Sequence, residues 1–191
     1  MKHQMKEDAV FSESVQYIQR KVQDILKTVS QKDVDQVKKL FFKANHVFVY
    51  GAGRSGLVAK AFAIRLVHLG FQAFVVGETI TIPVQEGDLV IIVSGSGETI
   101  PAVMTAEIAH NLKAKVVSIT GKKDSDIDQF ADITLFVSAG CNEEQRKRCA
   151  PLGTLFEASV WILLDGLIAD LLDSKNETEE TMRKRHATLQ G

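Results

Sequence analysis

The stretch that decides the fold is Leu89-Val90-Ile91-Ile92-Val93-Ser94-Gly95-Ser96-Gly97-Glu98-Thr99. Its continuous apolar run is typical of a parallel strand that is buried on both faces. The glycine-rich turn that follows leads into a segment with helical character. This order directs unpaired N–H groups and the positive end of a helix dipole to one point. The stretch therefore predicts an anion site, most often one for phosphate, with donors from Ser94, Ser96, Gly97 and Thr99.

Strand-like and helix-like segments alternate along most of the chain. The other expected strands are residues 46–50, 71–76, 115–119 and 133–137. A helix is expected over residues 57–69, and residues 141–148 are interpreted as an irregular polar stretch. Such alternation predicts an α/β fold: a three-layer α-β-α sandwich with a five-stranded parallel sheet wound on both faces. We interpret residues 1–191 as a single domain, in which N-terminal helices (1–45) precede an α/β core (46–173) and a C-terminal helix (174–191) follows it.

Composition and charge argue against several classes of protein. The formal net charge is −1, which is unfavourable for a nucleic-acid partner bound through its phosphates. No apolar run reaches the roughly 18 residues that a membrane span needs, so we expect no membrane partner. Cys141 and Cys149 have no neighbouring histidine, so we interpret them as reduced thiols rather than zinc ligands. Reduced thiols favour a cytoplasmic location.

A second glycine-rich turn, Gly51-Ala52-Gly53-Arg54-Ser55-Gly56, follows the first expected strand. Since both turns come at carboxyl ends of parallel strands, we expect them at one crevice. The glycine spacing matches the dinucleotide fingerprint, and Glu78 lies near the position of a ribose-binding acid, so a nicotinamide or flavin site is one interpretation. Arg54 and Ser55 add polar side chains where a dinucleotide needs only backbone, which favours a compact phosphate monoester. A third interpretation is that both turns have only a structural role.

Together these motifs resemble those of the sugar isomerase (SIS) domain proteins, whose sheet has flavodoxin-like winding. That family binds phosphosugars with a Ser/Thr-rich loop after a buried strand, as at residues 94–99. Within it, the chain is most similar to the 6-phospho-3-hexuloisomerases. The similar stretches are residues 51–63, Val76-Gly77-Glu78-Thr79, Pro151-Leu152-Gly153-Thr154-Leu155-Phe156-Glu157 and Met182-Arg183-Lys184-Arg185-His186-Ala187. Arabinose-5-phosphate isomerases usually have a lysine in the first glycine loop, where this chain has Arg54, and a His-rich segment after the second strand, which this chain lacks.

The resemblance implies an activity: conversion of D-arabino-hex-3-ulose 6-phosphate to D-fructose 6-phosphate in formaldehyde fixation through ribulose monophosphate. Moving the carbonyl to the adjacent carbon requires a cis-enediol(ate), a phosphate anchor, a base and a group that stabilises the enediolate oxygens. No metal or cofactor is implied. Isomerisation of another phosphosugar, such as arabinose 5-phosphate, and a non-catalytic phosphosugar sensor remain alternatives.

The resemblance also suggests an assembly, a homotetramer built as a dimer of dimers. Residues 8–29 have the apolar spacing of an amphipathic helix. Its apolar face would pack on a partner subunit or, equally well, on its own domain.

From the resemblance, two residues are expected to be catalytic. Glu157 is the expected base, although Thr154-Leu155-Phe156-Glu157 also has the pattern of a capping box, in which Glu157 would only close a helix N-terminus. His186 is the second candidate, for proton transfer or ring opening in its own crevice or in that of a neighbouring subunit. The alternative for His186 is a solvated surface histidine.

Three residues of the first glycine loop, Gly53, Arg54 and Ser55, are expected to contact the substrate. Ser55 would bind a sugar hydroxyl or a phosphate oxygen. Arg54 would screen the charge of the enediolate, and its alternative is a surface arginine that pairs with a carboxylate.

Overall fold

The computed structural model describes the backbone of residues 2–187 and the side chains of residues 10–187. The predicted domain limits at residues 1 and 191 lie outside the described residues. The elements are, in order, α1 (Lys2–Leu26), α2 (Gln31–Phe41), β1 (Val47–Gly51), α3 (Gly53–His68), β2 (Ala73–Val75), β3 (Leu89–Ser94), α4 (Ile100–Asn111), β4 (Lys115–Thr120), the 3-10 helix η1 (Asp126–Gln129), β5 (Ile133–Phe136), α5 (Glu143–Cys149), α6 (Thr154–Ser174) and α7 (Glu179–Lys184).

The five strands form one parallel sheet in the order β2-β1-β3-β4-β5. This order confirms the predicted sheet and its flavodoxin-like winding. β3 lies at the centre, and all of its residues are buried. A central strand covered on both faces requires apolar side chains in both directions, which explains the unbroken apolar run of its sequence.

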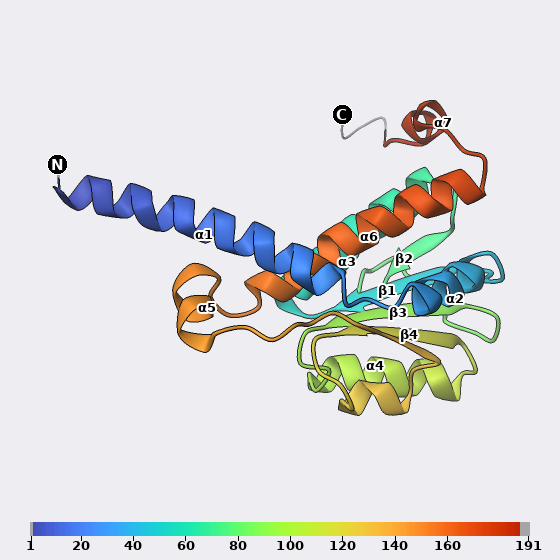
Figure 1. The fold of residues 1–191 in the computed structure, drawn as a ribbon. Helices are drawn as coiled ribbons and strands as arrows, with labels where there is room; N and C mark the ends of the chain where they lie inside the picture. The colour runs from blue at the N-terminus through green and yellow to red at the C-terminus, as the bar shows by residue number, and fades with distance from the viewer. Residues whose placement is uncertain (1, 188–191) are drawn as a thin grey trace.

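Helices cover both faces of the sheet (Figure 1). Successive side chains of a strand point to opposite faces, so Val47 and Val49 of β1 enter the core beneath α3 and α6, whereas Phe48 enters the core beneath α4. The α4 layer is the thinner one, because this helix contributes three alanines to the buried core: Ala102, Ala106 and Ala109.

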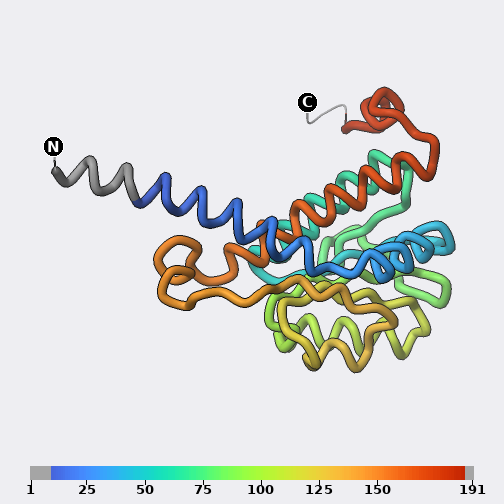
Figure 2. The backbone as a smooth tube through the Cα atoms, in the orientation of Figure 1, coloured from blue at the N-terminus to red at the C-terminus, as the bar shows by residue number. Residues whose placement is uncertain are grey.

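The blue part of helix α1 runs outward from the body of the molecule (Figure 2). The C-terminal half of α1 packs on its own chain, where Tyr17, Val22 and Ile25 are buried. Farther toward the N-terminus, the Phe11 side chain is exposed. The two alternatives for the amphipathic helix therefore apply to different parts of it: one half packs on its own domain, and the other leaves apolar surface uncovered.

Helix α3 begins earlier than its apolar spacing predicts. The sequence analysis expected the helix from residue 57, and it begins at Gly53. A close approach of two glycines permits this start, since a Cβ atom on Gly56 would lie 2.5 Å from the carbonyl oxygen of Gly51. As a result, Arg54 and Ser55 belong to the first helical turn.

Two features near the C-terminus also differ from the prediction. The polar stretch at residues 141–148 forms the short helix α5, which Asn142 caps by accepting a hydrogen bond from the Gln145 N–H. The C-terminal helix α7 is shorter than expected, because a turn with Asn176 in the left-handed region precedes it. Among the described residues, no helix is both long enough and apolar enough to cross a membrane.

Candidate active site

The two glycine-rich loops leave the sheet side by side. In the parallel pairing of β1 with β3, Gly51 lies opposite Val93, so both strands end at the same edge. The loop after β1 enters α3, and the loop after β3 enters α4. The structure therefore places both predicted loops at one crevice, as the sequence indicates.

The loop after β3 is held by its own hydroxyl groups. The Gly97 N–H donates to Ser94 Oγ at 3.2 Å, and the Glu98 N–H donates to Ser96 Oγ at 3.2 Å. The hydroxyls of Ser96 and Thr99 lie 3.3 Å apart. Ser94 is buried within the loop, whereas Ser96 is exposed. Ser94 thus shapes the loop, and Ser96 is the hydroxyl that the loop presents outward; their contact with phosphate remains a prediction.

Gly97 has a conformation that favours glycine. Its φ is +64°, in the left-handed region. A Cβ atom at this position would lie 2.2 Å from Ser125 Oγ and 2.9 Å from Thr120 Oγ1. The tight turn therefore depends on both backbone freedom and the absence of a side chain.

A cavity of about 350 Å³ opens beside this loop. Its volume lies within the usual range for small-molecule sites, roughly 300–1,000 Å³. Ser55, Ser96 and Glu157, which the sequence analysis selected from three separate stretches, all line it. The remaining lining residues are Ile25, Gly95, Gly121, Val137, Ser138, Ala139, Cys141, Arg146, Leu152, Gly153, Leu155 and Phe156.

The Glu157 carboxylate does not form the predicted alternative, a capping box. The N-cap of α6 is Gly153, and the Thr154 hydroxyl donates to the Pro151 carbonyl at 2.6 Å. The Glu157 carboxylate instead forms an ion pair with Arg54. The side chain of Glu157 is 12% exposed and that of Arg54 is 69% exposed, so the Glu157 carboxylate lies in the cavity wall and the Arg54 guanidinium covers it from solvent. Arg54 therefore pairs with a carboxylate, as one of its two interpretations predicts, and that carboxylate belongs to Glu157; screening of the enediolate charge by Arg54 remains a prediction.

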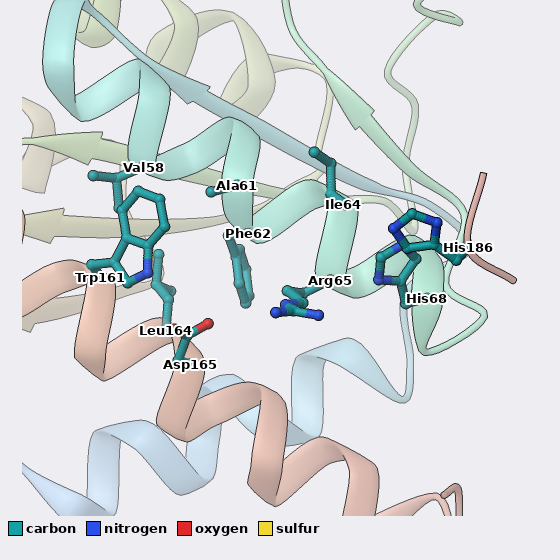
Figure 3. A pocket seen from close by; sticks show the side chains of 10 residues that line it. All are labelled: Val58, Ala61, Phe62, Ile64, Arg65, His68, Trp161, Leu164, Asp165 and His186. Atoms are coloured by element: carbon teal, nitrogen blue, oxygen red, sulfur yellow. The ribbon is translucent and has the colours of Figure 1, made fainter. Parts of the chain in front are cut away.

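The structure does not bring His186 into the crevice of its own chain. The centroid of its ring lies 5.0 Å from the ring centroid of His68, at the C-terminal end of α3 (Figure 3). Ser55 lies at the other end of the same helix, about 20 Å away at 1.5 Å of rise per residue. His186 lines a separate cavity of about 290 Å³ between α3 and α6.

His68, the neighbour of His186, is buried. Burial lowers the pKa of His68 below its ordinary value, and the nearby His186 and Arg65 lower it further. The imidazole is therefore held in its neutral form more strongly than a solvated histidine.

Close packing between β1 and α3 requires glycine in the first loop, independently of any ligand. A Cβ atom on Gly51 would lie 2.8 Å from Gly56 N, so strand and helix pack too closely there for a side chain. Glu78, the possible ribose-binding acid, pairs with Lys60 of α3 at 2.5 Å. The dinucleotide fingerprint is thus matched by residues that also serve the strand-to-helix packing.

The sequence analysis missed Arg146 of α5, which lines the cavity. It treated residues 141–148 as an irregular polar stretch. Capping signals for the helix were present, since Asn142 is a good N-cap and acidic residues precede basic ones along it. Those signals identify a helix, but the packing that turns Arg146 toward the crevice depends on distant parts of the chain.

Comparison with known proteins agrees with this fold. The SIS domain family matches residues 40–152. A 3-hexulose-6-phosphate isomerase of Bacillus subtilis is 39% identical over 85% of this chain and 89% of its own length. An uncharacterized protein of Archaeoglobus fulgidus is 37% identical over 92% of this chain and 98% of its own length.

A solved structure gives the same result at the level of the fold. A hypothetical protein of Methanococcus jannaschii, whose structure infers a molecular function of 3-hexulose-6-phosphate isomerase, superposes with a TM-score of 0.79 at 32% identity and covers 97% of this chain and 99% of its own. The chain therefore belongs to the SIS domain family and is similar over most of its length to 3-hexulose-6-phosphate isomerases.

Proposed function

We propose that this phosphosugar isomerase converts D-arabino-hex-3-ulose 6-phosphate to D-fructose 6-phosphate. The observation that carries the proposal is the shared cavity of Glu157 and the Ser96 loop, together with the freedom of Glu157 from a capping role. Relatives named 3-hexulose-6-phosphate isomerase support this substrate. In this role the enzyme serves formaldehyde fixation through ribulose monophosphate, and its two free thiols fit the cytoplasm.

In the proposed mechanism, the phosphate group anchors the substrate in the site. The loop at residues 94–99 holds the phosphate with hydroxyls and backbone N–H groups at the start of α4, where the helix dipole favours an anion. Ser55, at the start of α3, binds a sugar hydroxyl. Fixing both ends of an open-chain sugar orients the reacting carbons toward Glu157 and lowers the entropic part of the barrier.

Glu157 performs the proton transfer. Its carboxylate removes the proton from C2, and the electron pair of that C–H bond forms the C2=C3 double bond while charge moves to the oxygen on C3. The proton on the C2 oxygen then shifts to the C3 oxygen. Glu157 returns its proton to C3, which leaves the carbonyl at C2. Arg54 forms an ion pair with Glu157 and orients its carboxylate between turnovers.

His186 is assigned to the crevice of a neighbouring subunit, in a homotetramer arranged as a dimer of dimers. In its own chain the histidine lies at the opposite end of α3 from the crevice. Apolar side chains are exposed on α3 and α6: Ile64 and Trp161 line the same cavity as His186, and Leu57 and Ile162 lie beside Arg54 toward the other end of α3. A large exposed apolar patch of this kind is typical of a subunit contact.

The proposed activity is tested by a coupled assay in which a synthase makes the hexulose phosphate in situ from formaldehyde and ribulose 5-phosphate. Fructose 6-phosphate is measured for the wild type, Glu157→Gln and Asp170→Asn. Asp170 is the matched control, because it is a carboxylate of the same helix that pairs with Lys38, at 2.9 Å, away from the cavity. We expect wild-type turnover, an unchanged Asp170 variant, and loss of turnover in Glu157→Gln with inorganic phosphate binding retained.

Other outcomes separate the parts of the proposal. Turnover that survives in Glu157→Gln rejects this residue as the base and leaves the substrate assignment intact. If the wild type isomerises arabinose 5-phosphate but not the hexulose phosphate, the substrate is wrong. Binding of phosphosugars without any turnover identifies a sensor.

A further inference from the structure

We propose that Arg146 binds the two adjacent oxygens of the enediolate and is a catalytic residue of the isomerisation. The inference rests on the proposed function and adds a residue to it. Arg146 belongs to α5, and its side chain lines the cavity that also contains Ser96 and Glu157. With 21% of its side chain exposed, it is the more enclosed of the two arginines near the base.

The guanidinium of Arg146 is held in a fixed orientation. Its Nε and Nη2 atoms donate to the two carboxylate oxygens of Glu143, at 3.2 and 3.0 Å. Its Nη1 atom donates to the Leu152 carbonyl at 3.3 Å. A guanidinium has five N–H donors, so one N–H on Nη1 and one on Nη2 remain. These two N–H groups belong to the two terminal nitrogens, from which a guanidinium can bind a pair of oxygen atoms as a fork.

The same turn that holds Arg146 also positions Glu157. Leu152, whose carbonyl accepts from Arg146, is followed by Gly153, whose carbonyl accepts from the Glu157 N–H at 2.9 Å. The Glu157 carboxylate lies over Gly153, where an added Cβ atom would be 2.9 Å from its Oε1. The base and the fork are therefore tied to adjacent residues, which fixes their separation.

Backbone strain at Leu152 marks this turn. Its φ is +56°, a left-handed conformation that costs a non-glycine residue about 1–2 kcal/mol. The Leu152 side chain is exposed, so core packing does not explain the conformation. Strained backbone of this kind concentrates at functional sites, and here it directs a carbonyl to Arg146.

The chemistry of the intermediate matches the fork. A cis-enediolate is planar and presents two adjacent oxygens on one side, with the negative charge shared between them. Arg54 is less suited to this charge, because it is mostly exposed and pairs with the base. Arg146 is less exposed than Arg54, and a cation stabilises a developing anion more strongly where less water surrounds it.

The test compares Arg146→Gln and Arg146→Lys with Arg148→Gln in the same coupled assay. Arg148 is the matched control: it lies on the same helix and pairs with Glu13 at 2.8 Å. Binding of two probes is measured by calorimetry for every variant. One is inorganic phosphate, and the other is a phosphorylated aldonohydroxamate, whose planar group with two adjacent oxygens mimics the enediolate.

For Arg146→Gln we expect kcat to fall ~100-fold or more with little change in KM, as for loss of a donor that acts in the transition state. The hydroxamate should bind correspondingly less tightly, and inorganic phosphate should bind as to the wild type, which also shows that the variant is folded. Arg146→Lys keeps the charge without the fork, so its kcat should lie between those of the wild type and Arg146→Gln. Arg148→Gln should behave as the wild type.

Three results overturn the inference. Unchanged kcat in both Arg146 variants removes any role in the reaction. Parallel loss of inorganic phosphate and hydroxamate binding assigns Arg146 to the phosphate instead. Failure of the wild type to bind the hydroxamate shows that the cavity has no enediolate site. Absence of wild-type turnover, by contrast, rejects the proposed substrate, and hydroxamate binding then still decides whether Arg146 recognises adjacent oxygens.

Discussion

Replacing Gly97 by alanine should both destabilise the protein and abolish anion binding by the loop after β3. The left-handed backbone at φ +64° costs alanine about 1–2 kcal/mol. The new methyl group would lie 2.4 Å from Ser125 Cβ as well as 2.2 Å from its Oγ, and overpacking of this kind costs about 1–3 kcal/mol. Together the two costs should lower the free energy of unfolding by about 2–5 kcal/mol.

The matched control is Gly77→Ala, because Gly77 also has a positive φ, +95°, but has no atom within 4 Å of its added Cβ position. It therefore measures the conformational cost without the steric one. The free energy of unfolding is measured by urea denaturation at a fixed protein concentration, since an oligomer gains stability with concentration. Inorganic phosphate binding is measured by calorimetry.

The reasoning is refuted if Gly97→Ala is no less stable than Gly77→Ala, because the Ser125 clash would then relax at no cost. It is also refuted if Gly97→Ala loses stability but binds inorganic phosphate as tightly as the wild type. In that case the turn would have a structural role only.

Three further predictions concern stability. The pKa of His68 is lowered in the folded protein, mainly by burial. At pH values near the ordinary histidine pKa, the unfolded chain therefore binds more protons than the folded protein does. The free energy of unfolding should be full above about pH 6.5 and should fall as the pH drops below it. Thermal melting between pH 8 and 5 should show this slope, and an equal slope in His68→Asn would contradict it. Arg185 donates to the His68 carbonyl at 3.1 Å. Arg185 and Thr181 also lower the pKa of the Glu177 carboxyl to about 2. Glu177→Gln should therefore raise amide exchange in α7 at pH 7 and much less at pH 3. The Tyr17 hydroxyl is buried without a hydrogen-bond partner among the described residues, so Tyr17→Phe should leave the melting temperature unchanged or raise stability by up to about 1 kcal/mol; a clear loss would reveal a partner for the hydroxyl.

The sheet could be predicted because its signals are local and agree with one another. β3 is apolar on both faces because it is central, and the glycine turns come where parallel strands must end. The adjacency of the two loops follows from that topology without any knowledge of side-chain contacts. Ser55 and Ser96 could therefore be predicted to share one crevice, whereas Glu157 was selected through the resemblance to the isomerases.

The parts that could not be predicted depend on contacts between distant segments. The capping-box pattern at Thr154 is a local signal, and the capping box does not form because both side chains have other partners. The Thr154 hydroxyl donates to the Pro151 carbonyl, and Glu157 pairs with Arg54. The place of Arg146 depends equally on the fold of the turn at Leu152. His186 matched a family motif, yet no local pattern shows that it lies beside His68.

The thin layer on the α4 face affects how ligand binding changes the stability of the rest of the molecule. Alanines bring a helix close to a sheet but remove little apolar area from water, so this layer is held weakly compared with the opposite face. Weakly held layers are those that open first in native-state fluctuations. Because α4 begins directly after the loop that follows β3, a ligand bound to that loop would also hold α4 against the sheet. Part of the binding free energy would then appear as greater stability of this whole face.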